Sequence, residues 1–325
     1  MPIIRQELEM IPAPGRRVGV LQAAGISPAT YYRHLQPKLP RTKPQRALTC
    51  EEQALGERIR ALLERYSRWG YRKVWARLRR DEPGLKQGQV YRLMRRRGWL
   101  QPRGKRPPAM KRERFPEVTA PNQVWQMDVK AVDLGEWGEY QTINVVDYHS
   151  RYWLAGMLAD NQRAETLVRT LQLAVEEAQR LGGWEGLVPR LVPRSCSEGG
   201  SLGDGGTVLV VTDNGPGFKS RLLREYFRAS EGRLRHRRIR RETPEHNGRV
   251  ERLAGTIAYE IAHRLEGLDP LEAGLALLSF RHEYNHERPH MALDYRYPSE
   301  AHLDPIGARA EDVAVPADRH NPPED

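Results

Sequence analysis

The sequence predicts an α/β protein in which a mixed five-stranded sheet with flanking helices follows an all-α, strongly basic part. The 325 residues carry a net charge of +11, but residues 1–118 hold +18 and residues 119–325 hold −7. Up to about residue 100 the apolar residues recur at helical spacing. From residue 122 onward short apolar runs alternate with longer amphipathic ones, which is the order of an α/β domain.

The first helical segment lies at residues 18–35, VGVLQAAGISPATYYRHL. Gly25 marks a turn between two short helices, and Ser27 and Pro28 are suited to begin the second one. The pattern is that of a helix-turn-helix, although any small helical hairpin shares it. We predict a helix-turn-helix domain over residues 1–40, with Arg33 among its DNA-binding residues.

A second basic helical domain with its linker is predicted over residues 41–118. Helical spacing extends over 51–66 and 66–80 and resumes at about Gln87, with Gly98 as a stop signal. A Pro-rich basic linker follows at 101–119. A solvated basic face is the plain alternative, but clustering of the charge with helix signals favours nucleic acid. The side chains expected to bind DNA here are Arg72, Lys73, Arg92, Arg95 and Arg96. The last three are expected to contact phosphates rather than bases.

The catalytic core is predicted over residues 119–266 and a C-terminal helix and tail over 267–325. Strands are expected at 124–134, 140–150 and 152–158, as an antiparallel meander. A long helix over 163–182 and a glycine-rich insertion at 183–206 come next. The remaining elements are expected as a strand at 207–215, a helix at 220–230, a basic strand at 233–240, and helices at 247–266 and 270–286.

Three acidic residues stand out by their places in these elements. Asp128 interrupts an apolar strand, Asp213 ends another, and Glu251 begins a helix at the edge of its apolar stripe. Each has an ordinary explanation alone: a solvated face, a turn, or a favourable place in the helix dipole. Together they can converge, and converging carboxylates repel one another unless cations lie between them. Such oxygen ligands suit Mg²⁺ or Mn²⁺, and two ions suit phosphoryl transfer.

The motifs WQMDV, VTDNG and HNGRVER, with 37 residues between Asp213 and Glu251, resemble the core of DDE integrases and transposases. The closing segment, residues 284–302 (YNHERPHMALDYRYPSEAH), is similar to the tail of bacterial insertion-sequence transposases of the OrfB type. The basic segment WGYRKVWARLRR…VYRLMRRRGW resembles the helical domain that precedes the core in those proteins. The resemblance implies a ribonuclease-H-like core preceded by helix-turn-helix DNA-binding domains.

Carried over by position, the resemblance makes Asp128, Asp213 and Glu251 the metal-binding catalytic residues, with two Mg²⁺ or Mn²⁺ ions. The implied reaction nicks the ends of a mobile element and joins the freed 3′-hydroxyl to target DNA. One departure is Ala258, because the family usually carries Lys or Arg seven residues after the glutamate. Arg249 and Arg252, both predicted to bind DNA, are expected to compensate for it.

Composition limits the remaining classes of protein. There is no run of 18 apolar residues, so no membrane span is expected. Two widely separated cysteines encode neither a disulfide framework nor a cysteine-rich zinc site. The expected partners are double-stranded DNA and further copies of the chain, in the cytoplasm and at the nucleoid. Two alternatives stay open: a DNA-binding regulator with a degenerate core, and a metal-dependent nuclease on the same fold.

Overall fold

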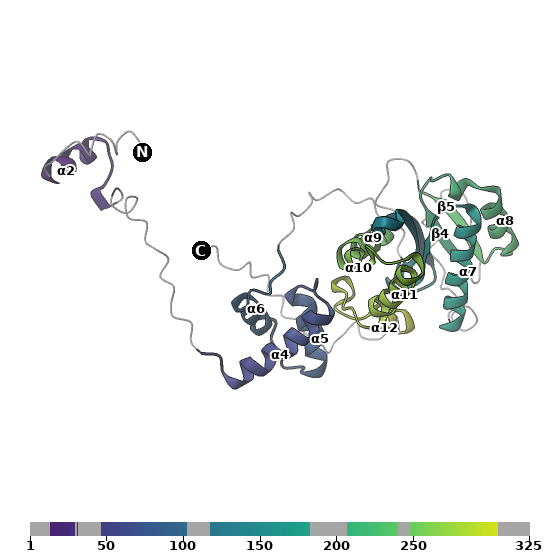
Figure 1. Ribbon diagram of the computed structural model, residues 1–325, viewed down its shortest axis with the longest axis horizontal. Coiled ribbons are helices and arrows are strands. Elements are labelled where there is room, and N and C mark those ends of the chain that lie inside the picture. The colour runs from purple at the N-terminus through teal and green to yellow at the C-terminus, as the bar shows by residue number, and fades with distance from the viewer. Residues whose placement is uncertain are drawn as a thin grey trace. The chain divides into compact units, whose positions relative to one another are not determined.

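The computed structural model describes residues 14–29, 31, 47–102, 118–182, 207–239 and 248–304, and divides the chain into two compact units, residues 1–53 and 54–325 (Figure 1). Arg33, the insertion at 183–206 and most of the linker at 101–119 lie outside the described residues. No helix in the described ranges is long and apolar enough to cross a membrane.

In the first unit, helix α2 (Pro14–Ala23) ends before the predicted turn. Gly25 has a φ of 69°, the left-handed region that glycine adopts without strain. Leu21 is fully buried and packs with Tyr31, the residue that follows the turn. The helix and turn predicted here are therefore present as far as the described residues extend.

The helical segment of the second unit comprises α4 (Cys50–Arg65), α5 (Tyr71–Asp81) and α6 (Gln87–Arg96). Val74, Leu78 and Met94 are among the buried residues that hold α5 and α6 together. Trp75 is buried and donates its indole N–H to the carbonyl oxygen of Leu85 at 2.8 Å. Arg72, Arg92, Arg95 and Arg97 are exposed on these helices and just after them.

The sheet has the strand order β3-β2-β1-β4-β5. Strands β1 (Val124–Asp133), β2 (Glu139–Asp147) and β3 (Trp153–Ala159) form the predicted antiparallel meander. Strands β4 (Val208–Thr212) and β5 (Leu234–Arg238) continue the sheet in parallel to β1. The predicted mixed five-stranded sheet is confirmed.

Alternate residues of β1 face two different layers of helices. Trp125 and Met127 pack with α7 (Ala164–Arg180) and α8 (Arg221–Ala229) on one face. Val132 packs with α9 (Gly248–Glu260), α10 (Ala262–Leu265) and α11 (Pro270–His286) on the other. Because side chains alternate along a strand, Gln126, Asp128 and Lys130 also face the α9 layer.

The single helix predicted over 247–266 is in fact two helices. The break lies at Ile261, whose φ of −126° leaves the helical range. Ile261 is buried in the core under the sheet, so the chain turns inward there and restarts as α10. A short helix that the periodicity did not predict, α12 (Pro298–Leu303), ends the described chain; the Glu300 side chain accepts a hydrogen bond from the Tyr297 N–H at 2.8 Å and caps it.

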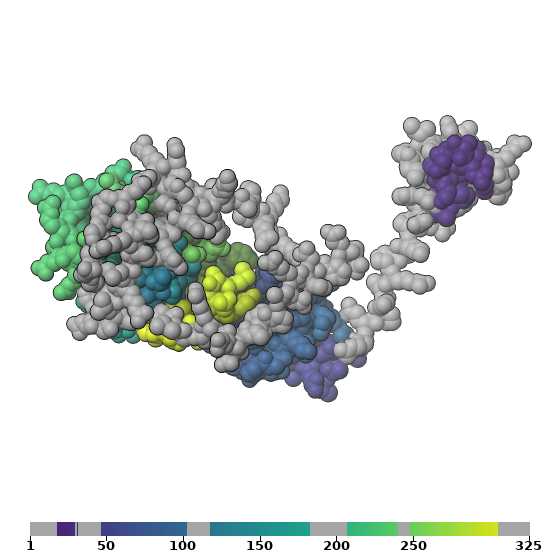
Figure 2. Space-filling model, turned by 180° about the vertical axis from the view of Figure 1, so that it is seen from behind, coloured from purple at the N-terminus to yellow at the C-terminus, as the bar shows by residue number. Residues whose placement is uncertain are grey.

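The helical segment is fastened to the core by ion pairs. Glu260, at the end of α9, is buried and accepts hydrogen bonds from Lys73 of α5 and from Arg288. Arg80 of α5 forms a bidentate pair with Glu300, at 2.6 and 2.7 Å. In Figure 2 the yellow surface of the closing segment accordingly lies beside the blue surface of the helical segment.

Candidate active site at the β1, β4 and α9 junction

The three acidic residues occupy neighbouring elements of one face of the sheet. Asp128 lies in the middle of β1, and Asp213 directly follows the last residue of β4. Met127 is paired with Thr212 between these parallel strands, so Asp128 and Asp213 take the next positions in register. Glu251 is in the first turn of α9. The packing of α9 under β1 thus brings it to the side on which Asp128 projects.

Gln126 attaches the start of α9 to β1. Its side-chain oxygen accepts hydrogen bonds from the backbone N–H groups of Arg249 (3.0 Å) and Val250 (3.1 Å). These are N–H groups of the first helical turn, which have no partner within the helix itself. Gln126 is completely buried and lies two residues before Asp128 on the same face. It therefore sets the position of Glu251, one residue beyond the bonds, relative to Asp128.

The acidic side chains act on one another electrostatically. Burial, and then the negative charge of Asp213, raise the pKa of Asp128 to about 6; Glu251 adds to this shift, and Lys130 opposes it. Burial also raises the pKa of Glu251, again opposed by Lys130. The site thus combines carboxylates that repel one another with one lysine, Lys130, that attracts both Asp128 and Glu251.

The turn after β4 is held by hydrogen bonds of its own residues. The Asp213 carboxylate accepts the N–H of Gly215 at 2.9 Å, and the Asn214 side chain donates to the carbonyl oxygen of Ile239 at 2.7 Å. A Cβ at position 215 would lie 3.1 Å from the Asp213 carboxylate oxygen, so glycine lets the turn close on that side chain. The Asp-Asn-Gly sequence thereby fixes Asp213 against β5.

Asn144 adds an oxygen beside Asp128. It stands directly opposite Asp128 on β2 and is completely buried, and its side-chain oxygen has no hydrogen-bond partner in the structure. Opposite residues of antiparallel strands project from the same face, about 5 Å apart. Three carboxylates and an unpartnered amide oxygen are the donors that a hard divalent cation takes. Within the described ranges no group of three or more His, Cys, Asp or Glu side chains is arranged so that it could hold a metal ion.

Comparison with known proteins fits this geometry. Residues 118–244 and 232–298 each match a model of the integrase core domain, and residues 51–107 match an HTH-like domain. The chain belongs to the integrase-core family of DDE polynucleotidyl transferases. Its strand order and flanking helices are those of the ribonuclease-H-like fold.

Two insertion-element proteins are homologous to this integrase-core enzyme. An uncharacterized 31.7 kDa protein of insertion element IS407 from Burkholderia multivorans is 27% identical, over 77% of this chain and 81% of that protein. The transposase InsD of insertion element IS2 from Escherichia coli is 28% identical, over 75% of this chain and 76% of that protein. Among solved structures, the HTLV-2 integrase catalytic core domain in complex with magnesium is 18% identical, with a TM-score of 0.40, over 57% of this chain and 99% of that one.

The basic residues predicted from the sequence lie in different surroundings around this core. Arg249 stacks on the ring of Tyr148 at 4.7 Å, and Arg252 is exposed one turn further along α9. The ammonium group of Lys73 has Glu260 as its partner. Arg72, Arg92 and Arg95 are exposed on the helical segment, where Arg96 is half-buried. DNA binding by any of these side chains stays a prediction.

Ala258 lies on a different side of α9 from Arg249 and Arg252, and their expected compensation for it stays a prediction. Ala258 is exposed and lines a cleft beside β1, and neither Arg249 nor Arg252 lines that cleft. At 100° per residue, Ala258 falls on the same flank of α9 as Glu251, whereas Arg249 and Arg252 fall 160° and 100° away from Glu251. Lys130, Gln126 and Asn144 are the residues that the sequence reasoning missed; period-two spacing from Asp128 along β1 would have indicated the first two.

Proposed function

We propose that this protein is a DNA transposase that binds the ends of a mobile element and catalyses their Mg²⁺-dependent 3′-end cleavage and strand transfer into target DNA. The observation that carries the proposal is the arrangement of Asp128, Asp213 and Glu251 around one junction of β1, β4 and α9. The match to an integrase core domain and the likeness to the transposase InsD support it.

In this proposal Asp128, Asp213 and Glu251 hold Mg²⁺ or Mn²⁺, as two ions. Bound ions supply Lewis-acid activation of the attacking oxygen and stabilise charge on the leaving one. Asp128 extends from a central strand and therefore gives the site a rigid ligand. The turn bond of Asp213 and the Gln126 contact to α9 support the proposal, because they hold the segments that carry the other two carboxylates.

Double-stranded DNA is the proposed substrate and partner. Residues 219–252 hold 12 basic and 5 acidic residues beside two of the three carboxylates, and the helical segment adds the exposed Arg72, Arg92 and Arg95. Positive surface beside an acidic metal site favours phosphate backbones over other substrates. Action on DNA agrees with a place in the cytoplasm and at the nucleoid.

Further copies of the chain are the second proposed partner. Leu271, Leu275 and Leu278 are 73, 59 and 50% exposed and are spaced along one face of α11, while Leu277 and Phe280 fill its buried face. A helix that is apolar on both sides favours burial on both sides. We therefore place a contact between two copies at this face, which suits a reaction that joins two DNA ends.

The test uses three isosteric substitutions, Asp128→Asn, Asp213→Asn and Glu251→Gln. Each is expected to abolish 3′-end cleavage and strand transfer, because the ligand charge is lost, while binding of the end DNA survives. Labelled duplexes carrying the DNA that flanks the gene report binding, nicking and joining in one assay. Retained cleavage in all three variants would contradict the proposal.

The same assay separates the two alternatives. A wild-type protein that binds the duplex but does not nick it in Mg²⁺ would be the regulator with a degenerate core. Ala258, which replaces the usual Lys or Arg, is the observation that suggests this alternative. A protein that nicks but never joins the labelled end to a target would be a nuclease on this fold.

A further inference from the structure

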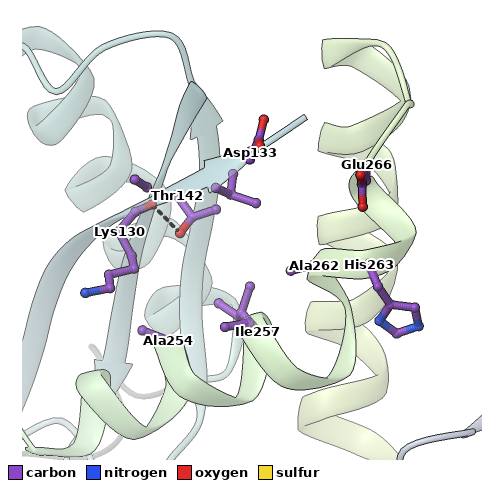
Figure 3. A pocket seen from close by; sticks show the side chains of 11 residues that line it. Lys130, Asp133, Thr142, Ala254, Ile257, Ala262, His263 and Glu266 are labelled. Atoms are coloured by element: carbon purple, nitrogen blue, oxygen red, sulfur yellow. Dashed lines mark hydrogen bonds between the residues drawn. The ribbon is translucent and has the colours of Figure 1, made fainter. Parts of the chain in front are cut away.

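A cleft of 390 Å³ opens between the second half of β1 and the helices α9 and α10. Its volume is within the range of roughly 300–1,000 Å³ that ligand sites occupy. Figure 3 shows Lys130 and Ala254 at one end of the cleft and His263 and Glu266 at the other. Lys130 lies two residues after Asp128, so this end adjoins the candidate active site.

The Lys130 end of the cleft carries a positive charge. Its backbone carbonyl is occupied, since it accepts a hydrogen bond from Thr142 at 3.0 Å, but its ammonium group has no ion pair within the described ranges. The charge of Lys130 opposes the rise in the pKa of both Asp128 and Glu251. A lysine left in this position is suited to a further anion that lies next to the carboxylates.

The opposite wall of the cleft leaves room for such an anion. Ala254, Ala258 and Ala262 recur every four residues along the flank of α9 and α10, with Ile257 between them. These methyl groups contribute apolar surface without reaching across the cleft. One apolar wall and one cation are the two features that a sugar–phosphate unit can use, the sugar on the wall and the phosphate at the lysine. Asp133 and Glu266 make the far end unfavourable for a phosphate.

We propose that this cleft holds the DNA strand that enters the active site, with Lys130 binding one of its phosphates near the 3′ end. The inference rests on the proposed function, because it needs DNA at the three carboxylates. In this proposal the DNA strand is bound by Lys130, a residue of β1. Ala258 then forms part of the cleft wall and does not stand for a lost DNA-binding cation.

The test compares wild type with Lys130→Ala, Lys130→Arg and the double variant Lys130→Ala/Ala258→Lys. Binding to a duplex with the flanking-DNA sequence and a recessed end is measured by fluorescence anisotropy in EDTA over a salt series. Loss of one phosphate contact reduces the magnitude of the slope of log K against log salt by about 0.9. The ratio of the wild-type to the variant binding constant therefore falls about eightfold per tenfold rise in salt. Arg169→Ala, on α7 behind the sheet, is the matched control for loss of one charge.

The expected result is a slope loss in Lys130→Ala, none in Lys130→Arg or Arg169→Ala, and recovery in the double variant, whose new lysine faces the same cleft. Duplexes with single methylphosphonates near the 3′ end identify the phosphate, since at one position the effect of Lys130→Ala disappears. An unchanged slope in Lys130→Ala, a slope loss that every methylphosphonate leaves intact, or no recovery in the double variant overturns the proposal. If Lys130 served only to offset the charge of the carboxylates, Lys130→Ala would change the Mg²⁺ dependence of cleavage relative to wild type. The slope of log K against log salt would then stay unchanged.

The same preparations separate this proposal from the function on which it rests. Wild type that binds the duplex but neither nicks nor joins it in Mg²⁺ overturns the transposase proposal alone. Wild type that nicks and joins, with unchanged binding by Lys130→Ala, overturns the cleft alone.

Discussion

At the scale of single residues, the site depends on Gln126 as well as on its acids. This side chain satisfies two N–H groups of the first turn of α9 and lies buried between Asp128 and the helix. A buried amide is a usual core residue, so its type alone indicates no role. Its hydrogen bonds make it a positioning residue, because they fix the separation of Asp128 from Glu251.

Gln126→Leu is expected to reduce the rate of cleavage strongly and the stability of the fold only moderately. Two buried N–H groups lose their acceptor, which costs about 1–3 kcal/mol of stability, and the first turn of α9 loosens. A shift of Glu251 by about 1 Å can cost on the order of 100-fold in rate. Single-turnover cleavage rates, at saturating DNA and as a function of Mg²⁺, measure the effect.

Two controls separate positioning from general destabilisation. Gln126→Glu keeps an acceptor for both N–H groups and is expected to retain more activity than Gln126→Leu. Gln141→Leu, on β2, removes a glutamine whose side chain donates a hydrogen bond to the exposed Glu139. Equal loss of activity in Gln126→Leu and Gln141→Leu would refute the positioning role.

At the scale of elements, α9 carries a carboxylate near each end. Glu251 lies in its first turn, and Glu260 receives Lys73 and Arg288 at its end. The carboxylate of Glu260 has a pKa below its ordinary value; burial opposes this, and the hydrogen bonds and charges of Arg288 and Lys73 prevail. One helix therefore links the active site to the helical segment.

Glu260→Gln is expected to lower the free energy of unfolding by about 3–5 kcal/mol, because it leaves the buried Arg288 and the partly buried Lys73 without their carboxylate partner. Arg80→Ala breaks the exposed pair with Glu300 in the same interface and is expected to cost at most about 1 kcal/mol. Urea denaturation measures both. Lys73→Met added to Glu260→Gln should recover part of the lost stability. Equal losses of stability in Glu260→Gln and Arg80→Ala would show that burial of the Glu260 ion pairs does not matter.

A second acid in this interface gives a pH dependence. Burial raises the pKa of Glu283 on α11 to about 7, with Glu260 and Glu287 adding to the shift and Arg264 and Arg65 opposing it. The folded state thus holds this proton more tightly than the unfolded state, whose pKa is about 4.3. Its contribution to stability is present below pH 4 and is lost as the pH rises to 7.

Glu283→Gln is therefore expected to gain stability over wild type at pH 8 but not at pH 4.5. After allowing for the half-exposed position, the gain is about 1–2 kcal/mol. Urea unfolding at the two pH values measures it, with the exposed Glu136→Gln as control. A gain for Glu283→Gln that is the same at both pH values would contradict the assignment.

At the scale of the whole molecule, the apolar face of α11 predicts self-association. Leu275→Glu places a charge in the middle of the exposed leucine stripe and is expected to shift the protein toward monomer, while α11 stays helical because glutamate favours helices. Sedimentation velocity over a concentration series measures the change. Leu303→Glu, at a leucine 57% exposed on α12, is the control and should leave the assembly unchanged.

The secondary structure was largely predictable because its signals are local. Short apolar runs separated by turns predicted β1 to β3, and the apolar stripe predicted α7 and most of α9. The break at Ile261 was not predictable, because the residues on both sides keep the same helical stripe and the chain bends only to bury Ile261 in the core. Lys73 likewise has the spacing of a basic helix face, and only the packing of α5 on the core gives it Glu260 as its partner.

The sequence by itself determined the order of the elements, the basic character of the first 118 residues and the identity of the three acids, because charge, period and motif spacing are properties of the chain. Only the tertiary structure decided what surrounds those acids. Gln126, Lys130 and Asn144 acquire their relation to Asp128 from strand register, and Glu251 joins them because α9 packs under β1. Contacts between residues more than a hundred positions apart depend on the fold, and no local signal in the sequence carries them.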